Sequence, residues 1–287
     1  MRIAHSVWTK PMVGNRWNLG NVLKSNIWLF SLSVAYAKRL GLEIVLHTDT
    51  QGKDIFNFLP YDKVFLTLDK INHIHERFWA AGKIFAQEAE PLGSVHIDGD
   101  VFLKKSNVVK MLREKGYDLF VQMIEGDESQ SCLGSCYAEN LDFVRRGLGN
   151  NKPVELNYNM EAALNCGLVA FHNAELKKKY IEGYKKMLET CSSSQSFVKR
   201  LIADPNICPD LIMEQWFLFS VASFYGAKIK TIIPNWGFNT DYLNDIGFTH
   251  LIGKKKYGVI PEVKKWLNII SPVIYGNAEN QIKKLNL

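Results

Sequence analysis

Asp98 and Asp100 have the residue type and spacing that most directly suggest chemistry, because they follow an apolar run at residues 95–97. Side chains two positions apart on an extended chain point the same way, so both carboxylates are predicted to lie on one side of the backbone. Gly99 between them has no Cβ, which lets the backbone turn sharply or a ligand come close. Oxygen ligands with open space around them suit Mg²⁺ or Mn²⁺, which keep coordination positions for water and a diphosphate. The alternative is a strand that ends in an acidic turn, but such carboxylates are costly to bury unless something neutralises them.

Three later stretches bring polar side chains into apolar patterns and extend this set of candidates. They are Asn165-Cys166-Gly167, the pair Glu214-Gln215, and His250 followed by Gly253 and Lys256. Each also has a structural explanation. An asparagine can cap a turn, an acidic pair can be an exposed helix face, and a single histidine is more often a structural hydrogen-bonding group than a ligand.

The elements that must position these residues alternate between strand and helix in the first part of the chain. Strands are predicted at 3–8, 43–47, 63–68 and 95–103, and helices at 23–40, 54–59 and 78–89. This alternation favours βαβ units and a mostly parallel sheet. In such sheets, ligands bind at the carboxyl ends of the strands, which places Trp8, Asp49 and Asp98 on one rim.

The second part of the chain is predicted to continue the same architecture with one long interruption. Strands are predicted at 117–123, 167–171 and 228–233, helices at 107–115, 175–189 and 210–224, and loops at 9–20, 192–194 and 234–244. Residues 125–159 are polar and rich in glycine, with a short helical piece at 141–146. A segment of this kind is usually a functional loop. Residues 261–287 are predicted to form a polar helical tail that packs on the outside.

Composition excludes several classes of protein. The chain has 287 residues, 47% of them hydrophobic and 12% aromatic, which favours a packed α/β domain over disorder. Its formal net charge of +6 is compatible with an anionic ligand and too weak to indicate a nucleic-acid partner. There is no run of about 18 apolar residues, so no integral membrane segment is expected, while weak peripheral association stays open. Five cysteines without a C-x-x-C pair and an N-terminus without an apolar signal core favour a cytoplasmic protein with free thiols.

Together and in this order, the polar stretches resemble motifs of glycosyltransferases with the GT-A fold, and of family 8 in particular. The matching stretches are Asp98-Gly99-Asp100, Asn165-Cys166-Gly167, Glu214-Gln215, and His250 with Gly253 and Lys256. The resemblance covers residues 1–260 and implies one GT-A-like, Rossmann-like α/β domain whose mostly parallel central sheet is flanked by helices. Its nucleotide-sugar and metal half is expected at 1–125, its acceptor half at 126–260, and a C-terminal helical tail at 261–287.

The resemblance also implies the reaction, which is transfer of a sugar from a nucleotide diphosphate sugar, expected to be a UDP-sugar. The acceptor is a carbohydrate, a lipid-linked molecule or a protein, and retention at the anomeric carbon is favoured slightly over inversion. Asp98, Asp100 and His250 are the implied ligands of Mn²⁺ or Mg²⁺, which would stabilise the leaving diphosphate. Gln215 and Glu214 are the implied catalytic residues. The expected donor-binding residues are Val7, Trp8, Thr9, Lys83, Asp98, Gly99, Asn165, Gly167, Gly253 and Lys256.

The chain departs from the family pattern in three places. Tyr257-Gly258 follows the late lysine where Pro-Trp is usual, Ile97-Asp98-Gly99-Asp100 replaces Leu-Asp-Ala-Asp, and Val7-Trp8-Thr9 is not the usual N-terminal pattern.

A sugar nucleotidyltransferase is an alternative, although its glycine-rich N-terminal signature is missing. A phosphatase of the Asp-x-Asp-x-Thr type requires Thr or Val where Phe102 stands. A non-catalytic nucleotide- or carbohydrate-binding protein of the same fold is the third alternative. An inverting enzyme would need a carboxylate base, for which Glu214 and Asp210 are the candidates.

Overall fold

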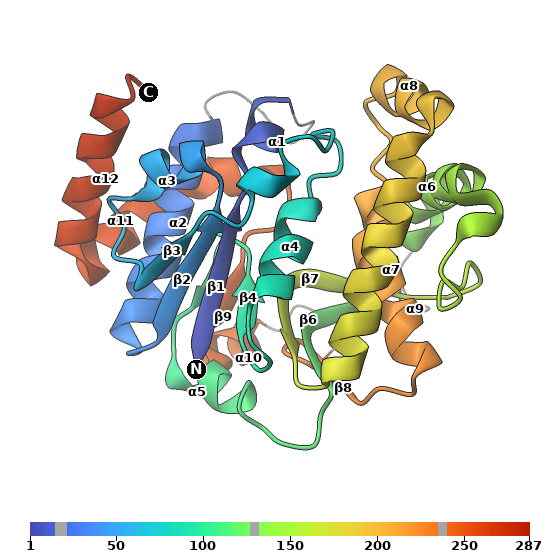
Figure 1. Cartoon of the computed structure of the whole chain (residues 1–287). Coiled ribbons are helices and arrows are strands. Elements are labelled where there is room, and N and C mark those ends of the chain that lie inside the picture. The colour runs from blue at the N-terminus through green and yellow to red at the C-terminus, as the bar shows by residue number, and fades with distance from the viewer. Residues whose placement is uncertain (15–21, 127–131, 235–239) are drawn as a thin grey trace.

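The computed structural model describes residues 1–14, 22–126, 132–234 and 240–287. Within them, a seven-stranded sheet with the order β3-β2-β1-β4-β7-β6-β8 forms the centre (Figure 1). β7 is antiparallel to its neighbours β4 and β6, and the other neighbouring strands run parallel to each other. The prediction of an α/β domain with a mostly parallel sheet is therefore confirmed. The strands are β1 (Arg2–Val7), β2 (Glu43–Thr48), β3 (Lys63–Phe65), β4 (Val95–Ile97), β6 (Leu119–Glu125), β7 (Ala163–Phe171) and β8 (Ile229–Thr231).

Helices cover both faces of the sheet, which explains why its strands are apolar runs rather than alternating patterns. All nine residues of β7 are buried. Leu168 and Ala170 belong to one core, and Val169 and Phe171 belong to the other, because successive side chains of a strand point to opposite faces. Figure 1 shows α4 (Ala81–Ala89) and α7 (Ala174–Ser193) on the side opposite α2 (Val22–Arg39).

The stretch at 95–103 was predicted as a strand broken in the middle by the two aspartates and Gly99, and the break is confirmed. The chain leaves β4 at Ile97, turns at residues 98–100, where the amide of Val101 donates to the carbonyl of Asp98 at 3.0 Å, and enters β5 (Val101–Leu103). β5 belongs to a separate two-stranded sheet with β9 (Phe248–His250), which was not predicted. The glycine between the aspartates therefore serves a turn.

The polar segment at 125–159 was predicted as a long loop with a short helical piece at 141–146, and the helix is longer than predicted. The segment contains α6 (Cys132–Leu148), followed by the 3-10 turn Gly149–Asn151, while residues 127–131 lie outside the described part. Phe143, Val144 and Leu148 are buried at helical spacing and belong to the core that α7 covers. Packing of this apolar face outweighs the low helix propensity of the glycines.

Several shorter predictions also differ from the structure, two of them because of helix caps. Residues 9–14 form α1 (Thr9–Gly14) instead of a loop, and 15–21 lie outside the described residues. α3 (Thr50–Phe56) begins before residue 54 because the Asp49 side chain accepts from the Gly52 amide. The expected linker at 192–194 is the end of α7 and the start of α8 (Gln195–Ala203), where the Ser194 hydroxyl accepts from Phe197. The remaining short helices are α5 (Ser106–Met111) and α10 (Thr240–Ile246), of which α10 replaces part of the loop predicted at 234–244, while 235–239 lie outside the described residues.

The helix predicted at 210–224 is present, but its first part is wound as a π-helix, Leu211–Trp216, which continues into α9 (Phe217–Phe224). The carboxylate of Asp210 anchors its start, because it accepts from the Ala80 amide at 2.8 Å and from the Tyr184 hydroxyl at 3.0 Å. π-Helical turns are rare and often occur at functional sites.

The C-terminal residues are helical as predicted and form α11 (Ile260–Ile270) and α12 (Pro272–Lys284). Both helices pack against α2, and Val263, Leu267 and Ile274 are buried in the same core as β1 and β2. These helices thus extend the helical layer around α2. Among the described helices, none combines the length and the apolar character needed to cross a membrane.

Candidate metal centre and cavity

The candidate site lies at the edge of the sheet where parallel strands end. β1 ends at Val7, β4 at Ile97 and β6 at Glu125, and the antiparallel β7 begins at this edge with Ala163. A cavity of about 550 Å³ opens here. This is the position that parallel α/β sheets use for ligands.

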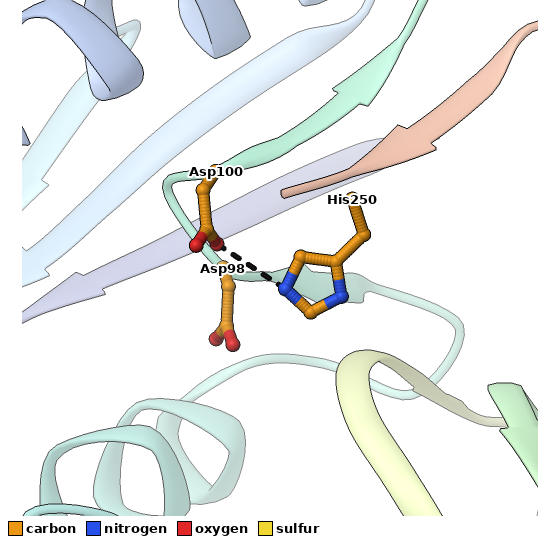
Figure 2. A group of neighbouring side chains, drawn as sticks. All are labelled: Asp98, Asp100 and His250. Carbon is orange, nitrogen blue, oxygen red and sulfur yellow. Dashed lines mark ion pairs between the residues drawn. The ribbon is translucent and has the colours of Figure 1, made fainter. Parts of the chain in front are cut away.

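Asp98, Asp100 and His250 converge at this edge, as the sequence predicted. One potential ligand atom of each lies within 4.8 Å of the others (Figure 2). Both aspartates come from the turn between β4 and β5, and His250 comes from β9, whose pairing with β5 sets it opposite Val101. Two carboxylates and one imidazole at this spacing can share one divalent cation and leave other coordination positions open. The three side chains therefore fit the metal that the sequence implied.

Gln122 sets which nitrogen of His250 faces the aspartates. His250 Nδ1 lies 2.6 Å from Gln122 Oε1, which accepts the ring hydrogen. Nε2 then carries the lone pair, 3.4 Å from Asp100 Oδ1. A histidine ligand commonly has its other nitrogen held in this way. Two lone pairs that face each other across a gap favour a cation between them.

Two lysines neutralise the aspartates. The sequence suggested carboxylates without a partner, whereas in the structure each one has a lysine beside it. Lys83 Nζ lies 2.9 Å from Asp98 Oδ1, and Lys256 Nζ lies 2.9 Å from Asp100 Oδ2. Burial disfavours the charged form of Asp100, but the ammonium group of Lys256 outweighs it and holds the pKa of Asp100 below the usual value. Burial also disfavours the charged form of Lys83, and the carboxylates of Asp98 and Glu214 outweigh it and raise its pKa.

The two expected catalytic residues occupy different environments. Gln215 lines the cavity, whereas Glu214 has 0% of its surface exposed and does not line it. Glu214 Oε1 lies 3.3 Å from Lys83 Nζ. Burial raises the pKa of Glu214 to about 8, although Lys83 acts in the opposite direction. Glu214 is therefore a buried partner of Lys83, without access to a ligand in the cavity.

Of the expected donor-binding residues, Thr9 is the one that the structure places away from the cavity. Its amide and its hydroxyl both donate to Asp49 Oδ2, at 2.8 and 2.7 Å, so it fastens the end of β1 to the start of α3. The other expected residues line the cavity, and they are Val7, Trp8, Lys83, Asp98, Gly99, Asn165, Gly167, Gly253 and Lys256.

Sequence reasoning missed several polar residues of the cavity, among them Glu125 and Tyr137. Glu125 is the last residue of β6, and the rule that strand ends carry ligands was sufficient to find it. Tyr137 lies in the part of α6 that was predicted as a loop, so its side chain had no expected direction. The missed apolar wall comes mainly from Leu29, Phe30, Trp79, Leu211 and Ile252.

Gly167→Ala is expected to weaken metal binding without unfolding the protein. An added Cβ would lie 2.5 Å from His250 Cε1 and 2.6 Å from Gln122 Oε1, so the imidazole and its partner must move. Losses of about tenfold in metal affinity are typical when the support of a ligand is disturbed. Mn²⁺ titration by calorimetry measures the effect. Gly276→Ala on α12, where the added methyl group has open space, is the control and should leave the affinity unchanged.

Glu214 is expected to make stability depend on pH, and Glu214→Gln to remove this dependence. Its pKa of about 8 exceeds the ordinary value of 4.5, so between these values the folded protein holds more protons than the unfolded chain, and stability falls as pH rises. From about pH 5 to pH 8, the free energy of unfolding of the variant should rise relative to that of the parent by up to about 1.4 kcal/mol per pH unit. Urea unfolding in the absence of divalent metal measures this. If the free energies of unfolding of the two proteins change with pH in parallel, the prediction is wrong.

Comparison with known proteins places the chain in a family and assigns no activity. A search of the curated proteins found no match. The model of a family described as a family of unknown function, DUF6734, matches residues 1–277, which include every residue of the cavity and of the metal centre. The chain therefore belongs to the family DUF6734.

Proposed function

We propose that the protein is a metal-dependent glycosyltransferase of the GT-A type that takes a sugar from a nucleotide diphosphate sugar. The observation that carries this proposal is the cluster of Asp98, Asp100 and His250 at the cavity, with Lys83 and Lys256 beside it. A metal site with cations close to it suits a substrate that brings both phosphate and a leaving group. The order of motifs that resembles family 8 supports the same assignment.

The charges of the centre agree with such a substrate. Two carboxylates and two ammonium groups sum to zero, with His250 neutral. A divalent cation brings two positive charges, and the diphosphate of a nucleotide sugar brings two negative charges, so the occupied centre is again neutral. A neutral total matters because Asp100 and Lys83 are buried, and uncompensated charge is costly there.

The cavity has room for the rest of the donor. Its volume of about 550 Å³ lies within the usual range of about 300–1,000 Å³ for ligand sites. Val7, Leu29 and Phe30 give one part of its lining an apolar surface suited to a nucleoside base. Asn165 and Gln215 give another part polar groups that suit the hydroxyls of a sugar.

The residues of the chain divide the work of the reaction. Asp98, Asp100 and His250 would hold Mn²⁺, or Mg²⁺ as the second choice, because an imidazole ligand favours the transition metal. When bound, this ion supplies Lewis-acid stabilisation of the leaving diphosphate. Lys256 would add a positive charge beside it, and Gln215 would face the sugar. Glu214 and Asp210 are both fully buried, so neither is placed to accept a proton from an acceptor hydroxyl, and this favours retention.

A thermal-shift panel of nucleoside diphosphates and nucleotide sugars, each with and without Mn²⁺, tests the proposal. A ligand at 100 times its dissociation constant adds about 2.7 kcal/mol of stability, which raises the melting temperature by several degrees. We expect UDP and a UDP-sugar to stabilise the protein only when Mn²⁺ is present. Release of UDP from the stabilising donor then distinguishes an enzyme from a binding protein. Release of pyrophosphate from a nucleoside triphosphate and a sugar phosphate would instead identify a nucleotidyltransferase.

A further inference from the structure

One polar corner of the cavity joins four side chains from four different elements. Glu125 at the end of β6 accepts from the Asn165 amide of β7 at 2.6 Å and from the Tyr137 hydroxyl of α6 at 2.7 Å. Tyr137 Oη also lies 2.6 Å from the carboxamide of Gln215 in the π-helix. All four residues line the cavity. The corner therefore connects Gln215 to a carboxylate through one phenol.

The number of hydrogens in this corner decides how the groups are arranged. Both oxygens of Glu125 accept, which describes an ionised carboxylate without a hydrogen of its own. Burial and the nearby Glu125 carboxylate raise the pKa of Tyr137 well above its ordinary value, so the phenol keeps its single hydrogen. A hydrogen bond to a carboxylate is stronger than one to a neutral amide, so this hydrogen goes to Glu125.

The second contact of the phenol must then receive a hydrogen from Gln215. A phenol oxygen that has given its hydrogen to Glu125 offers only lone pairs, so a carbonyl oxygen 2.6 Å away would be unsatisfied. The carboxamide nitrogen satisfies the contact, and exchanging the two ends of the amide leaves the shape of the side chain unchanged. With Nε2 on Tyr137, the carbonyl Oε1 is the end of Gln215 left for the cavity.

We propose that Glu125 and Tyr137 are positioning residues that hold the Gln215 carboxamide with its carbonyl oxygen toward the sugar. This inference rests on the proposed glycosyl transfer. The carbonyl dipole faces the anomeric carbon, where positive charge develops as the diphosphate leaves, and a fixed dipole stabilises that charge without having to reorient. The reversed amide would present an N–H group to the same carbon and oppose the reaction.

Tyr137→Phe and Glu125→Gln test the inference by two different routes. Phenylalanine removes the hydroxyl and keeps the ring beside Trp216, where the ring centroids are 6.0 Å apart. Glutamine can donate to the phenol, which sends the phenol hydrogen to Gln215 and reverses its amide. For each variant we expect kcat to fall at least about tenfold. The KM for the donor and the Mn²⁺-dependent affinity for UDP should stay within about twofold of the parent values. Tyr225→Phe, which removes a phenol from Glu155 outside the cavity, is the matched control and should leave kcat unchanged.

A second measurement separates this inference from the proposed function. The side-chain amide of Gln215 is observed by ¹H–¹⁵N NMR and assigned by its absence in Gln215→Leu. We expect one amide proton with slow exchange in the parent and fast exchange in Tyr137→Phe. If the amide signals do not respond to either variant, or if they respond while kcat is unchanged, the inference is overturned. If they respond and no donor is turned over, the positioning stands and the glycosyl-transfer proposal fails. Should Tyr137→Phe not fold, Glu125→Gln gives the same readouts.

Discussion

Asp98→Asn and Asp100→Asn are each expected to abolish the Mn²⁺-dependent stabilisation of the protein by UDP. Each substitution keeps the size of the side chain and removes one anionic oxygen from a cluster of three ligands. An amide oxygen is a weaker ligand for a divalent cation than a carboxylate, and we expect the loss in affinity to be at least about 100-fold. Thermal shift with UDP, with and without Mn²⁺, measures it directly.

Asp62→Asn is the matched control for both variants. Asp62 is also paired with a lysine, because Lys38 Nζ lies 2.6 Å from its Oδ1, but it does not line the cavity. Its substitution should leave the UDP response intact. His250→Ala should weaken the response less, since a water molecule can replace one neutral ligand. If the two cavity variants keep the Mn²⁺ dependence of the parent, the turn at 98–100 is only structural and the enzyme proposal falls with it.

Lys83→Met is expected to lower stability and nucleotide binding together. Lys83 is 9% exposed and lies between Asp98, at 2.9 Å, and Glu214, at 3.3 Å. Removing one partner from a buried ion pair typically costs about 3–5 kcal/mol, and at pH 7 we expect about 2–3 here, because Glu214 already holds a proton and Asp98 is partly exposed. Chemical unfolding measures the stability, and UDP titration in the presence of Mn²⁺ measures the binding.

The double variant Lys83→Met with Glu214→Gln separates the two effects. At pH 9, where Glu214 is ionised in the parent, glutamine removes the buried carboxylate that Lys83 compensates, and we expect it to restore a large part of the lost stability. UDP binding should stay weak, because the ammonium group is still missing. If the double variant is no more stable than Lys83→Met, Glu214 is not the group that makes Lys83 important for stability.

Much of the fold was predictable because long apolar runs and helix ends carry local signals. The apolar runs of β1 and β2 and the periodicity of α2 predicted the ends of these elements to within about one residue. Gly41 has the positive φ of 66° that is common just after the end of a helix. α6 was predicted only at 141–146, because its apolar face is interrupted by glycine and polar residues. β5 and β9 are three residues each, too short to show a period.

The metal centre was predictable as a set of residue types, and its electrostatics were not. The order of Asp98, Asp100 and His250 in the chain resembled a known pattern, and the structure brings them together. The pairing of Lys83 with Asp98 and of Lys256 with Asp100 depends on distances that only the folded chain defines. The π-helix has no sequence signal of its own, and it decides that Glu214 is buried while Gln215 faces the cavity.

The pairing of β5 with β9 also sets the time at which the centre can form during synthesis. A ribosome delivers residues 98–103 long before it delivers residues 248–250, and an unfinished chain holds the two aspartates without the imidazole. Docking of β9 must also occur in register, because a slip of one residue would turn His250 to the opposite face. If the centre binds metal as proposed, a nascent or truncated chain lacks a complete ligand set and would bind a scarce divalent metal weakly, so only the finished protein would take up the metal.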